Sequence, residues 1–444
     1  MTASREYLRT LLELSFADRE SELRRLSAEE RKALRYYWKL WARESQLPPP
    51  GDWQTWLICA GRGFGKTRAG AEWVRRYAQH NADARIALVA ASLVEARAVM
   101  VEGESGIMAV CPPENYPLFE PSLRRISWGN GAQAFLYSAA EAESLRGPQH
   151  HIAWCDELAK WENAADRAGR AWDNLLLGLR LGERPRALVT TTPRPVPLMR
   201  RLVEDSRGRA TAITRGTTAE NTHHLAEAFL TSMSERFGNT TLGRQELGGE
   251  LLEDIEGALW TRSLLEACRD EASGDPPQRV VVGVDPPASE HGDACGIVVC
   301  GLGASGIAQV LADCSVERAS PETWARAVAE AARAWSADRV VAEANQGGQM
   351  VASVLRAADI ALPLKLVHAS RGKAARAEPV AALYESGRVR HSGLFARLED
   401  QMCGLLTGGG YEGPGRSPDR ADALIWGLSE LMLGKSARPR VRQV

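Results

Sequence analysis

Between residues 56 and 192, hydrophobic positions form short continuous runs, separated by stretches in which they recur every three or four residues. The runs have the length and composition of buried strands: WLICA (56–60), IALVAA (86–91), HIAWC (151–155) and RALVTTT (186–192). Strands that alternate with helices in this way predict a parallel sheet with helices on both faces. The first 45 residues repeat Leu, Glu and Arg at helical spacing and predict surface helices before this sheet.

The pattern stops and restarts around SGDPPQ (273–278), the best linker candidate in the chain. The elements expected after it are strands at 279–285, 296–302 and 307–313, a helix at 320–335, a buried strand at 338–344 and helices up to Leu433. Ser320 and Pro321 are typical of a helix start. Three antiparallel strands, a helix, another strand and further helices follow each other in the RNase H-like order.

Composition excludes several classes of protein. The 444 residues are 44% hydrophobic and 25% charged, which is typical of a folded chain of two or three domains and not of a disordered or collagen-like one. With 55 basic and 56 acidic residues the net charge is −1, so any contact with nucleic acid must come from local patches. None of the 8 cysteines forms a C-x-x-C pair, which predicts free thiols in a reducing compartment and no zinc site.

No segment predicts secretion or a membrane span. The N-terminus carries charges throughout and lacks the apolar core of a signal peptide. The longest uncharged run, 294–312, contains four glycines, and two strands joined by the turn GLGASG explain it better than a membrane helix does. We therefore expect a soluble cytoplasmic protein without a membrane partner.

A glycine-rich segment follows the first strand. AGRGFGKT (60–67) lies between that strand and an expected helix at 68–78, which is the context that a phosphate-binding loop requires. Gly61, Gly63 and Gly65 let backbone N–H groups turn toward phosphate groups, and the helix N-terminus adds a partial positive charge. A chance glycine-rich turn would not be expected to combine these features.

The other residues of the loop suit a nucleotide and a metal ion. Lys66 would reach the β- and γ-phosphates of ATP, and Thr67 would hold Mg²⁺. Arg62 adds a positive charge near the γ-phosphate. Ala60 stands where the usual motif has its first glycine, which is a mild departure. Before the loop, Gln46 in SQLPPP is a candidate to contact the adenine ring.

An acidic pair ends a later strand. In HIAWCDE (151–157), Asp156 suits the water shell of Mg²⁺, and Glu157 suits the base that polarises the attacking water. Acidic pairs at strand ends are common, so this pair indicates a nucleotide site only together with the phosphate-binding loop that precedes it. Thr191, in the strand end TTTP, is a candidate sensor of the γ-phosphate, and Arg146 is a candidate arginine finger. Alternatively, Thr191 only belongs to a Thr-rich strand end, and Arg146 is an ordinary surface arginine.

Acidic residues of the C-terminal part also lie where strands end or a helix begins. Asp285 ends one strand, Glu343 lies late in another, and Asp419 and Asp422 open the helix of PDRADALIWGLSELM. A carboxylate within an apolar pattern is costly unless it is paired or bound to metal. Carboxylates that converge on one edge would hold two Mg²⁺ or Mn²⁺ for phosphodiester cleavage, with Asp293 as a further candidate. Alternatively, Asp419 is a helix N-terminal carboxylate favoured by the dipole.

Two basic clusters are candidates for sequence-independent contacts with DNA phosphates. Their alternative role is that of a solvated surface. Their basic residues are Lys365, His368, Arg371, Lys373 and Arg376 in the first cluster and Lys435, Arg438, Arg440 and Arg442 in the C-terminal tail.

In this order, Gln46, GRGFGKT, WCDE, TTTP and the carboxylates resemble the large terminase subunit of tailed bacteriophages and phage-derived gene-transfer agents. The stretches WLICAGRGFGKTRAGAEWV (56–74) and TTLGRQELGGELLEDIEGALW (240–260) are similar to that family too. The resemblance extends from residue 40 to 432. It implies an ATP-driven motor that translocates double-stranded DNA into a procapsid and cuts the concatemer with a metal-dependent endonuclease.

The resemblance also implies roles for individual residues. The ATPase centre would comprise Lys66, Thr67, Asp156 and Glu157, with Arg62 as a loop arginine. Arg146 would act on the nucleotide of a neighbouring subunit, and Thr190 to Thr192 would couple hydrolysis to movement. The set Asp285, Glu343 and Asp419 would hold the nuclease metals, with Asp419 preferred to Asp422 because it lies nearest the preceding loop.

The implied cofactors are ATP with Mg²⁺ at the first site and two Mg²⁺ or Mn²⁺ at the second. The implied partners are double-stranded DNA, a small terminase subunit, the portal protein of the procapsid and further copies of the chain in a ring. The protein would lie in the cytoplasm of a bacterial host cell and transiently at the portal vertex.

We therefore predict an α/β fold in which a P-loop NTPase domain, a parallel sheet flanked by helices, precedes an RNase H-like nuclease domain. The expected parts are a helical lead-in (1–50), the ATPase domain (51–215), a lid or linker subdomain (216–272) and the nuclease domain with its basic tail (273–444). Three alternatives remain: a helicase-like or repair ATPase fused to a nuclease, a capsid or scaffold protein with degenerate sites, and a packaging ATPase whose second domain only clamps DNA.

Overall fold

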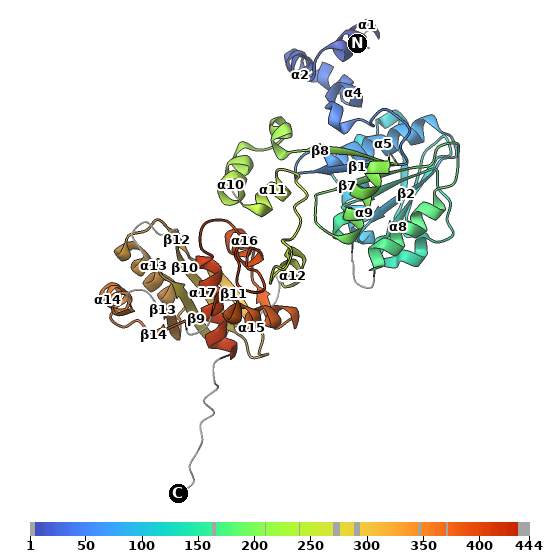
Figure 1. Ribbon diagram of the computed structural model, residues 1–444. Coiled ribbons are helices and arrows are strands. Elements are labelled where there is room, and N and C mark those ends of the chain that lie inside the picture. The colour runs from blue at the N-terminus through green and yellow to red at the C-terminus, as the bar shows by residue number, and fades with distance from the viewer. Residues whose placement is uncertain are drawn as a thin grey trace. The chain divides into compact units, whose positions relative to one another are not determined.

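The computed structural model describes residues 5–161, 166–208, 210–238, 240–269, 276–287, 294–344, 348–369 and 372–433. Of the candidate residues, Asp293, Arg371 and the basic tail 434–444 lie outside these ranges. The chain divides into two compact units, residues 1–252 and 253–444, which are coloured from blue to yellow-green and from there to red in Figure 1. The domain boundaries predicted after residues 215 and 272 stay predictions.

The first unit is built on an eight-stranded sheet with the order β3-β4-β5-β2-β6-β7-β1-β8. From β5 to β8 all neighbouring strands are parallel, whereas β3 and β4 pair antiparallel at one edge. The four strands predicted from apolar runs are confirmed as β1, β2, β6 and β7. The strands are β1 (Thr55–Ala60), β2 (Arg85–Ala90), β3 (Leu118–Glu120), β4 (Arg125–Ser127), β5 (Gln133–Ser138), β6 (Ile152–Asp156), β7 (Arg186–Thr191) and β8 (Thr211–Gly216).

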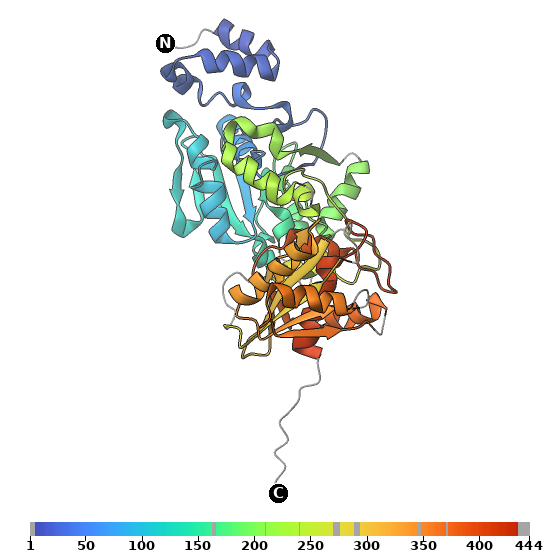
Figure 2. The ribbon, with the colours of Figure 1, turned by 90° about the vertical axis from the view of Figure 1, so that its left-hand side faces the viewer.

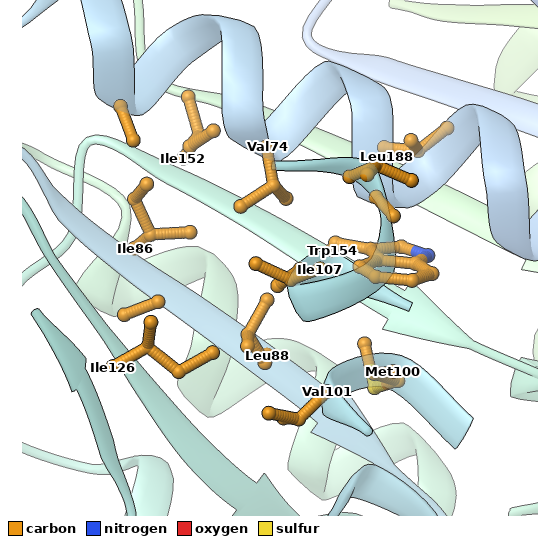
Figure 3. Packing of buried hydrophobic residues seen from close by; sticks show 14 of the residues in the cluster. Val74, Ile86, Leu88, Met100, Val101, Ile107, Ile126, Ile152, Trp154 and Leu188 are labelled. Carbon is orange, nitrogen blue, oxygen red and sulfur yellow. The ribbon is translucent and has the colours of Figure 1, made fainter. Parts of the chain in front are cut away.

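Helices cover both faces of this sheet, as the alternating side chains of β1 show. Trp56 and Ile58 join a cluster with the buried face of α5, whereas Leu57 and Cys59 join a second cluster with α8 and α9. In the first cluster, Val74 of α5 packs over Ile86 and the indole of Trp154 (Figure 3). The helices are α5 (Lys66–His80), α6 (Leu93–Glu95), α7 (Ile107–Val110), α8 (Arg167–Gly178), α9 (Pro197–Asp205), α10 (Glu227–Phe237) and α11 (Thr241–Glu246).

The predicted lead-in helices are present and have an apolar core of their own. Leu11, Leu23, Leu34 and Leu40 are each at most 3% exposed and pack together, in the blue segment of Figures 1 and 2. Ser15 and Ser27 cap the second and third helices by accepting hydrogen bonds from backbone N–H groups. The four helices are α1 (Arg5–Glu13), α2 (Phe16–Arg25), α3 (Ala28–Leu34) and α4 (Trp38–Trp41).

The second unit has a mixed sheet with the order β14-β13-β9-β10-β11-β15, and β12 pairs with β10. Strands β9, β10 and β11 are antiparallel, and β13 runs parallel to β9. This confirms the predicted RNase H-like order. The strands are β9 (Arg279–Asp285), β10 (Ala294–Leu302), β11 (Ala308–Asp313), β12 (Val316–Glu317), β13 (Arg339–Glu343), β14 (Leu364–Val367) and β15 (Val389–His391).

Helices again cover both faces. Val280, Val282 and Val284 of β9 pack against α13 and α14, whereas Val281 packs in the cluster that contains α15, α16 and α17. The helices are α12 (Arg262–Ala267), α13 (Pro321–Ala334), α14 (Gly348–Ala358), α15 (Lys373–Glu385), α16 (Ala396–Cys403) and α17 (Asp419–Leu428), which continues as a π-helical turn (Ser429–Leu433).

All eight cysteines are free thiols, and six of them are buried. Among the described helices, none is long and apolar enough to cross a membrane.

Candidate active sites

The glycine-rich loop connects β1 to α5 in the first unit. Gly63 and Gly65 adopt positive φ angles of 74° and 92°, which glycine tolerates without steric cost. A Cβ atom on Gly65 would lie 2.5 Å from the Nε2 atom of Gln46, so the loop also approaches its neighbour too closely for a side chain. Gln46 is buried and donates a hydrogen bond of 3.2 Å to the carbonyl of Phe64. The loop is therefore an open backbone cradle, and Gln46 lies directly beside it.

Residues far away in the sequence hold the loop from its other sides. Thr218 donates a hydrogen bond of 2.6 Å to the carbonyl of Arg62, and Asn221 donates one of 2.6 Å to that of Gly63. The guanidinium of Arg62 forms an ion pair with Glu246. The segment after β8 therefore positions the phosphate-binding loop, which no local sequence signal indicates.

Lys66 is buried at the start of α5, with 7% of its surface exposed. Its ammonium donates hydrogen bonds of 2.8 Å and 3.0 Å to the carbonyls of Ala60 and Gly61, and one of 3.1 Å to Thr192 Oγ1. Burial lowers the pKa of Lys66, and the carboxylates of Glu157 and Asp156 oppose that shift. The amine is thus fixed between the loop and the end of β7.

Asp156 ends β6 and is buried among polar groups. Its Oδ1 atom accepts a hydrogen bond of 2.6 Å from the hydroxyl of Thr190, which in turn accepts one of 2.8 Å from the indole of Trp154. Burial and, next, the charge of Glu157 raise the pKa of Asp156 to about 7, although the bond from Thr190 and the ammonium of Lys66 act in the opposite direction. A nearby cation would restore the carboxylate, so this environment is suited to a bound divalent ion.

Glu157 has a left-handed backbone, with φ 45° and ψ 47°, which is uncommon for a residue other than glycine. Such conformations cost of order 1–3 kcal/mol and concentrate at functional sites. Its carboxylate accepts a hydrogen bond of 3.3 Å from the backbone N–H of Thr192. Thr191 accepts a bond of 3.1 Å from the N–H of Ala159 and donates one of 2.9 Å to the carbonyl of Thr192. The acidic pair and the threonines therefore form one network.

The remaining candidates of this unit lie at the edge of that network. Thr67 follows Lys66 in the first turn of α5 and is half-buried. A cavity of about 520 Å³ adjoins Gln46 and Gly65; its lining includes Trp38 and several basic side chains. Arg146 follows a 3₁₀ turn (Ala139–Leu145), with 78% of its side chain exposed and a long ion pair of 3.9 Å to Glu143. Its exposure leaves it available to another molecule.

In the second unit, strand pairing places two of the candidate carboxylates next to each other. Ala342 of β13 is opposite Val284 of β9, so the following residues, Glu343 and Asp285, end neighbouring parallel strands. Gly296 of β10 is opposite Asp285. A Cβ atom on Gly296 would lie 1.9 Å from the carbonyl oxygen of Asp419, so only glycine lets the first turn of α17 approach the sheet this closely.

The helix α17 brings two further carboxylates to the same edge. Asp419 is 8% exposed and accepts a hydrogen bond of 3.1 Å from the N–H of Ala294, and Asp422 is 2% exposed. Burial raises the pKa of Asp285 well above its usual range, and the charges of Asp422, Glu343 and Asp419 raise it further. Four carboxylates therefore act on one another electrostatically within a buried space.

Basic groups of α15 neutralise part of this charge. Lys373 donates a hydrogen bond of 2.7 Å to Asp422, and Arg376 donates one of 3.1 Å to Glu343. The guanidinium of Arg376 lies 4.6 Å from the ring centre of Trp426, whose indole donates a bond of 2.7 Å to the same oxygen of Glu343. Of the described side chains, no three carboxylate, histidine or cysteine groups already surround one point as a metal ion would require. The donors are nevertheless the oxygen ligands that Mg²⁺ and Mn²⁺ prefer, and they carry excess negative charge.

The groups that support this cluster are not among the residues predicted from the sequence. Gln401 accepts hydrogen bonds from the N–H groups of Arg420 and Ala421 and thereby caps α17. Arg420 forms an ion pair of 2.6 Å with Asp313, at the end of β11. These residues lie more than 100 positions apart or on separate helices, so spacing along the chain gives no signal for them.

The fold and the two sites define a protein with an ATPase domain, built around a phosphate-binding loop, and an RNase H-like nuclease domain that gathers carboxylates. The family "Terminase large subunit, T4likevirus-type, N-terminal" matches residues 57–267, and the family "Terminase RNaseH-like domain" matches residues 282–431. Together the two matches span most of the chain. The chain belongs to the large terminase subunits, the ATPase and nuclease subunits of DNA-packaging motors. These matches do not favour the alternative of a helicase-like or repair ATPase fused to a nuclease.

Several solved structures are similar to the chain. The large terminase of the thermophilic bacteriophage D6E in complex with ADP is 10% identical; the match covers 90% of this chain and 98% of that one, with a TM-score of 0.41. The large terminase of bacteriophage HK97 is 15% identical over 91% and 95% of the two chains, with a TM-score of 0.37. No curated protein matches the chain.

Proposed function

We propose that the loop between β1 and α5 binds the phosphates of ATP and that the network opposite it directs hydrolysis. The observation that carries this proposal is the position of Lys66, whose ammonium lies between the loop carbonyls and the end of β7. Phosphate oxygens would replace these neutral partners, because an ammonium is held more strongly by a negatively charged oxygen than by a carbonyl oxygen. Gln46 would contact the adenine ring, and Arg62 would exchange Glu246 for the γ-phosphate.

In this proposal, Thr67 and Asp156 hold Mg²⁺, which when bound neutralises charge on the β- and γ-phosphates. Glu157 orients and deprotonates the attacking water, and its strained backbone points the carboxylate toward Thr192. Departure of the γ-phosphate would change the partners of Lys66 and Glu157. Both contact Thr192, so the end of β7, with Thr190 and Thr191, is the path by which hydrolysis reaches the rest of the unit.

For the second unit we propose a two-metal endonuclease. Asp285, Glu343 and Asp419 would hold two Mg²⁺ or Mn²⁺, which would supply the positive charge that phosphodiester cleavage requires. Asp422 joins this set, because it lies deepest in the cluster and acts on Asp285 most strongly among the carboxylates. The protein would translocate double-stranded DNA into a procapsid and cut the concatemer.

The proposed partners follow from that activity. They are double-stranded DNA, a small terminase subunit, the portal protein and further copies of this chain in a ring, in the cytoplasm of a bacterial host and at the portal vertex. Arg146 would complete the site of a neighbouring subunit, since its guanidinium is exposed and weakly held.

The nuclease assignment is tested with supercoiled plasmid and Mg²⁺ or Mn²⁺, using the full chain and its Asp285→Asn variant. Metal-dependent cutting that the variant loses supports the assignment. A wild-type protein that hydrolyses ATP but leaves the plasmid intact with both metals would overturn it and would favour a domain that only clamps DNA.

The role of Arg146 is tested by mixing two inactive variants. Lys66→Ala subunits offer Arg146 but bind ATP poorly, whereas Arg146→Ala subunits bind ATP but lack the arginine. If Arg146 acts on a neighbour, DNA-stimulated ATP turnover of the mixture exceeds the sum of the two separate preparations. Turnover equal to that sum would contradict the proposal.

A further inference from the structure

Two cations of α15 touch the carboxylates of the second unit in different ways. The side chain of Lys373 is 43% exposed, whereas that of Arg376 is 11% exposed. Lys373 is the first residue of α15, and a Cβ atom built on the preceding Gly372 would meet no atom of the described residues within 4 Å. Lys373 therefore reaches Asp422 from an open edge of the cluster.

Arg376 is fixed from several directions. It lies over the indole of Trp426, donates to Glu343 and is 3.9 Å from Asp422. Moving this guanidinium would break a cation–π contact and remove a counter-charge from the half-buried Glu343 and the buried Asp422, which is costly. Arg376 therefore serves as a permanent part of the cluster.

Lys373 is held by fewer contacts than Arg376. Its ammonium is held by Asp422 at 2.7 Å and by the hydroxyl of Ser417 at 3.3 Å, and its flexible stem is partly in solvent. Because the ammonium end is exposed, water can replace the partners that it loses, whereas the buried carboxylate needs another cation in its place. A divalent cation bound to Asp422 would repel the ammonium and take over its oxygen.

We propose that Lys373 exchanges Asp422 for the scissile phosphate of DNA when metal binds. This inference rests on the proposed nuclease function. Without metal, the ammonium compensates the charge of the buried Asp422 carboxylate. When Asp422 becomes a metal ligand, the ammonium is released at the open edge of the site and contacts a non-bridging phosphate oxygen. Lys373 thus opposes metal binding to the free protein and supports substrate binding to the loaded one.

If Lys373 makes this exchange, removing its charge should strengthen metal binding to the free protein and weaken binding of DNA. Lys373→Met keeps the length of the stem but removes the ammonium, so Mn²⁺ affinity in the absence of DNA should rise roughly five- to tenfold at low ionic strength. The KM for plasmid at saturating Mn²⁺ should rise by a similar factor, because one phosphate contact is lost. Lys373→Arg keeps a cation and should stay near wild type in metal affinity.

Arg326 provides a control with the same change of charge. Its side chain is 64% exposed and pairs with Glu322 on helix α13, outside the carboxylate cluster. Arg326→Met should change neither quantity more than twofold. Mn²⁺ binding is followed by the electron paramagnetic resonance signal of the free ion, and the part of it that Asp285→Asn abolishes is assigned to the nuclease site.

The outcomes separate this inference from the proposed function. Asp285-dependent Mn²⁺ binding that Lys373→Met leaves unchanged or weakens would overturn the exchange and leave the nuclease standing. Tighter binding together with an unchanged or lower KM for plasmid would make Lys373 a purely inhibitory counter-charge and would also overturn it. Absence of both Asp285-dependent Mn²⁺ binding and cleavage in the wild type would overturn the nuclease assignment and, with it, the exchange.

Discussion

Gly296→Ala perturbs the proposed nuclease site through a single methyl group. The new Cβ atom would lie 1.9 Å from the carbonyl oxygen of Asp419, and ordinary contact begins at 3.4 Å. The start of α17 must therefore retreat by about 1.5 Å from β10. Overpacking of this kind typically costs about 1–3 kcal/mol of unfolding free energy, and a catalytic group displaced by about 1 Å costs on the order of a hundredfold in rate.

Gly393→Ala in the same unit is the matched control, because its Cβ atom would meet its nearest neighbour, the ring of Phe395, at an ordinary 3.8 Å. The expected result is that Gly296→Ala loses at least tenfold in metal-dependent plasmid cleavage and unfolds at lower urea concentration, whereas Gly393→Ala does neither. ATP turnover of both variants is measured on the same preparations. Wild-type cleavage by Gly296→Ala would refute the reasoning, since the close approach of α17 would then have no role in placing Asp419.

Three other variants test separate contacts. Lys66→Ala should lower ATP turnover at least a hundredfold, because it removes the ammonium that lies between the loop and β7. Turnover within tenfold of wild type would contradict the assignment of the loop. Gln46→Ala should lower the preference for ATP over GTP, measured as the ratio of kcat/KM values, by roughly tenfold, the value of about one hydrogen bond; an unchanged ratio would exclude contact with the base. Burial raises the pKa of Glu399, but bonds from His391 and Arg269 outweigh it and lower that pKa from 4.5 to about 2. The charged form therefore contributes about 3 kcal/mol of stability above pH 4.5, which is lost as the pH falls toward 2. Between pH 5 and pH 3, the free energy of unfolding measured by urea denaturation should fall less for Glu399→Gln than for wild type. Equal losses would refute the assignment of this pH dependence to Glu399.

The cores of both units could be predicted because the hydrophobic pattern is local. The runs 56–60 and 280–284 are apolar throughout, and burial on both faces of a sheet is the physical reason for such runs. The phosphate-binding loop was also predictable, because its backbone conformation depends on glycines at fixed spacing and its cation follows directly in the next turn.

The environment of each site required the tertiary structure. Thr218, Asn221 and Glu246 hold the loop from more than 150 residues away, and the left-handed backbone of Glu157 has no signature in its residue type. In the second unit, the sequence predicted carboxylates at strand ends but could not place α15 beside α17.

By itself, the sequence determined which residues are candidates for the chemistry of both sites, because residue type, strand ends and glycine spacing are properties of short segments. Only the tertiary structure decided which partners the charged groups have. The ammonium of Lys66 is held by loop carbonyls and Thr192, and the carboxylate of Asp422 is paired with Lys373 and Arg376. Compensation depends on distances of a few ångströms between elements that are remote in the chain. It is set by packing, as where Gly296 lets α17 approach the sheet.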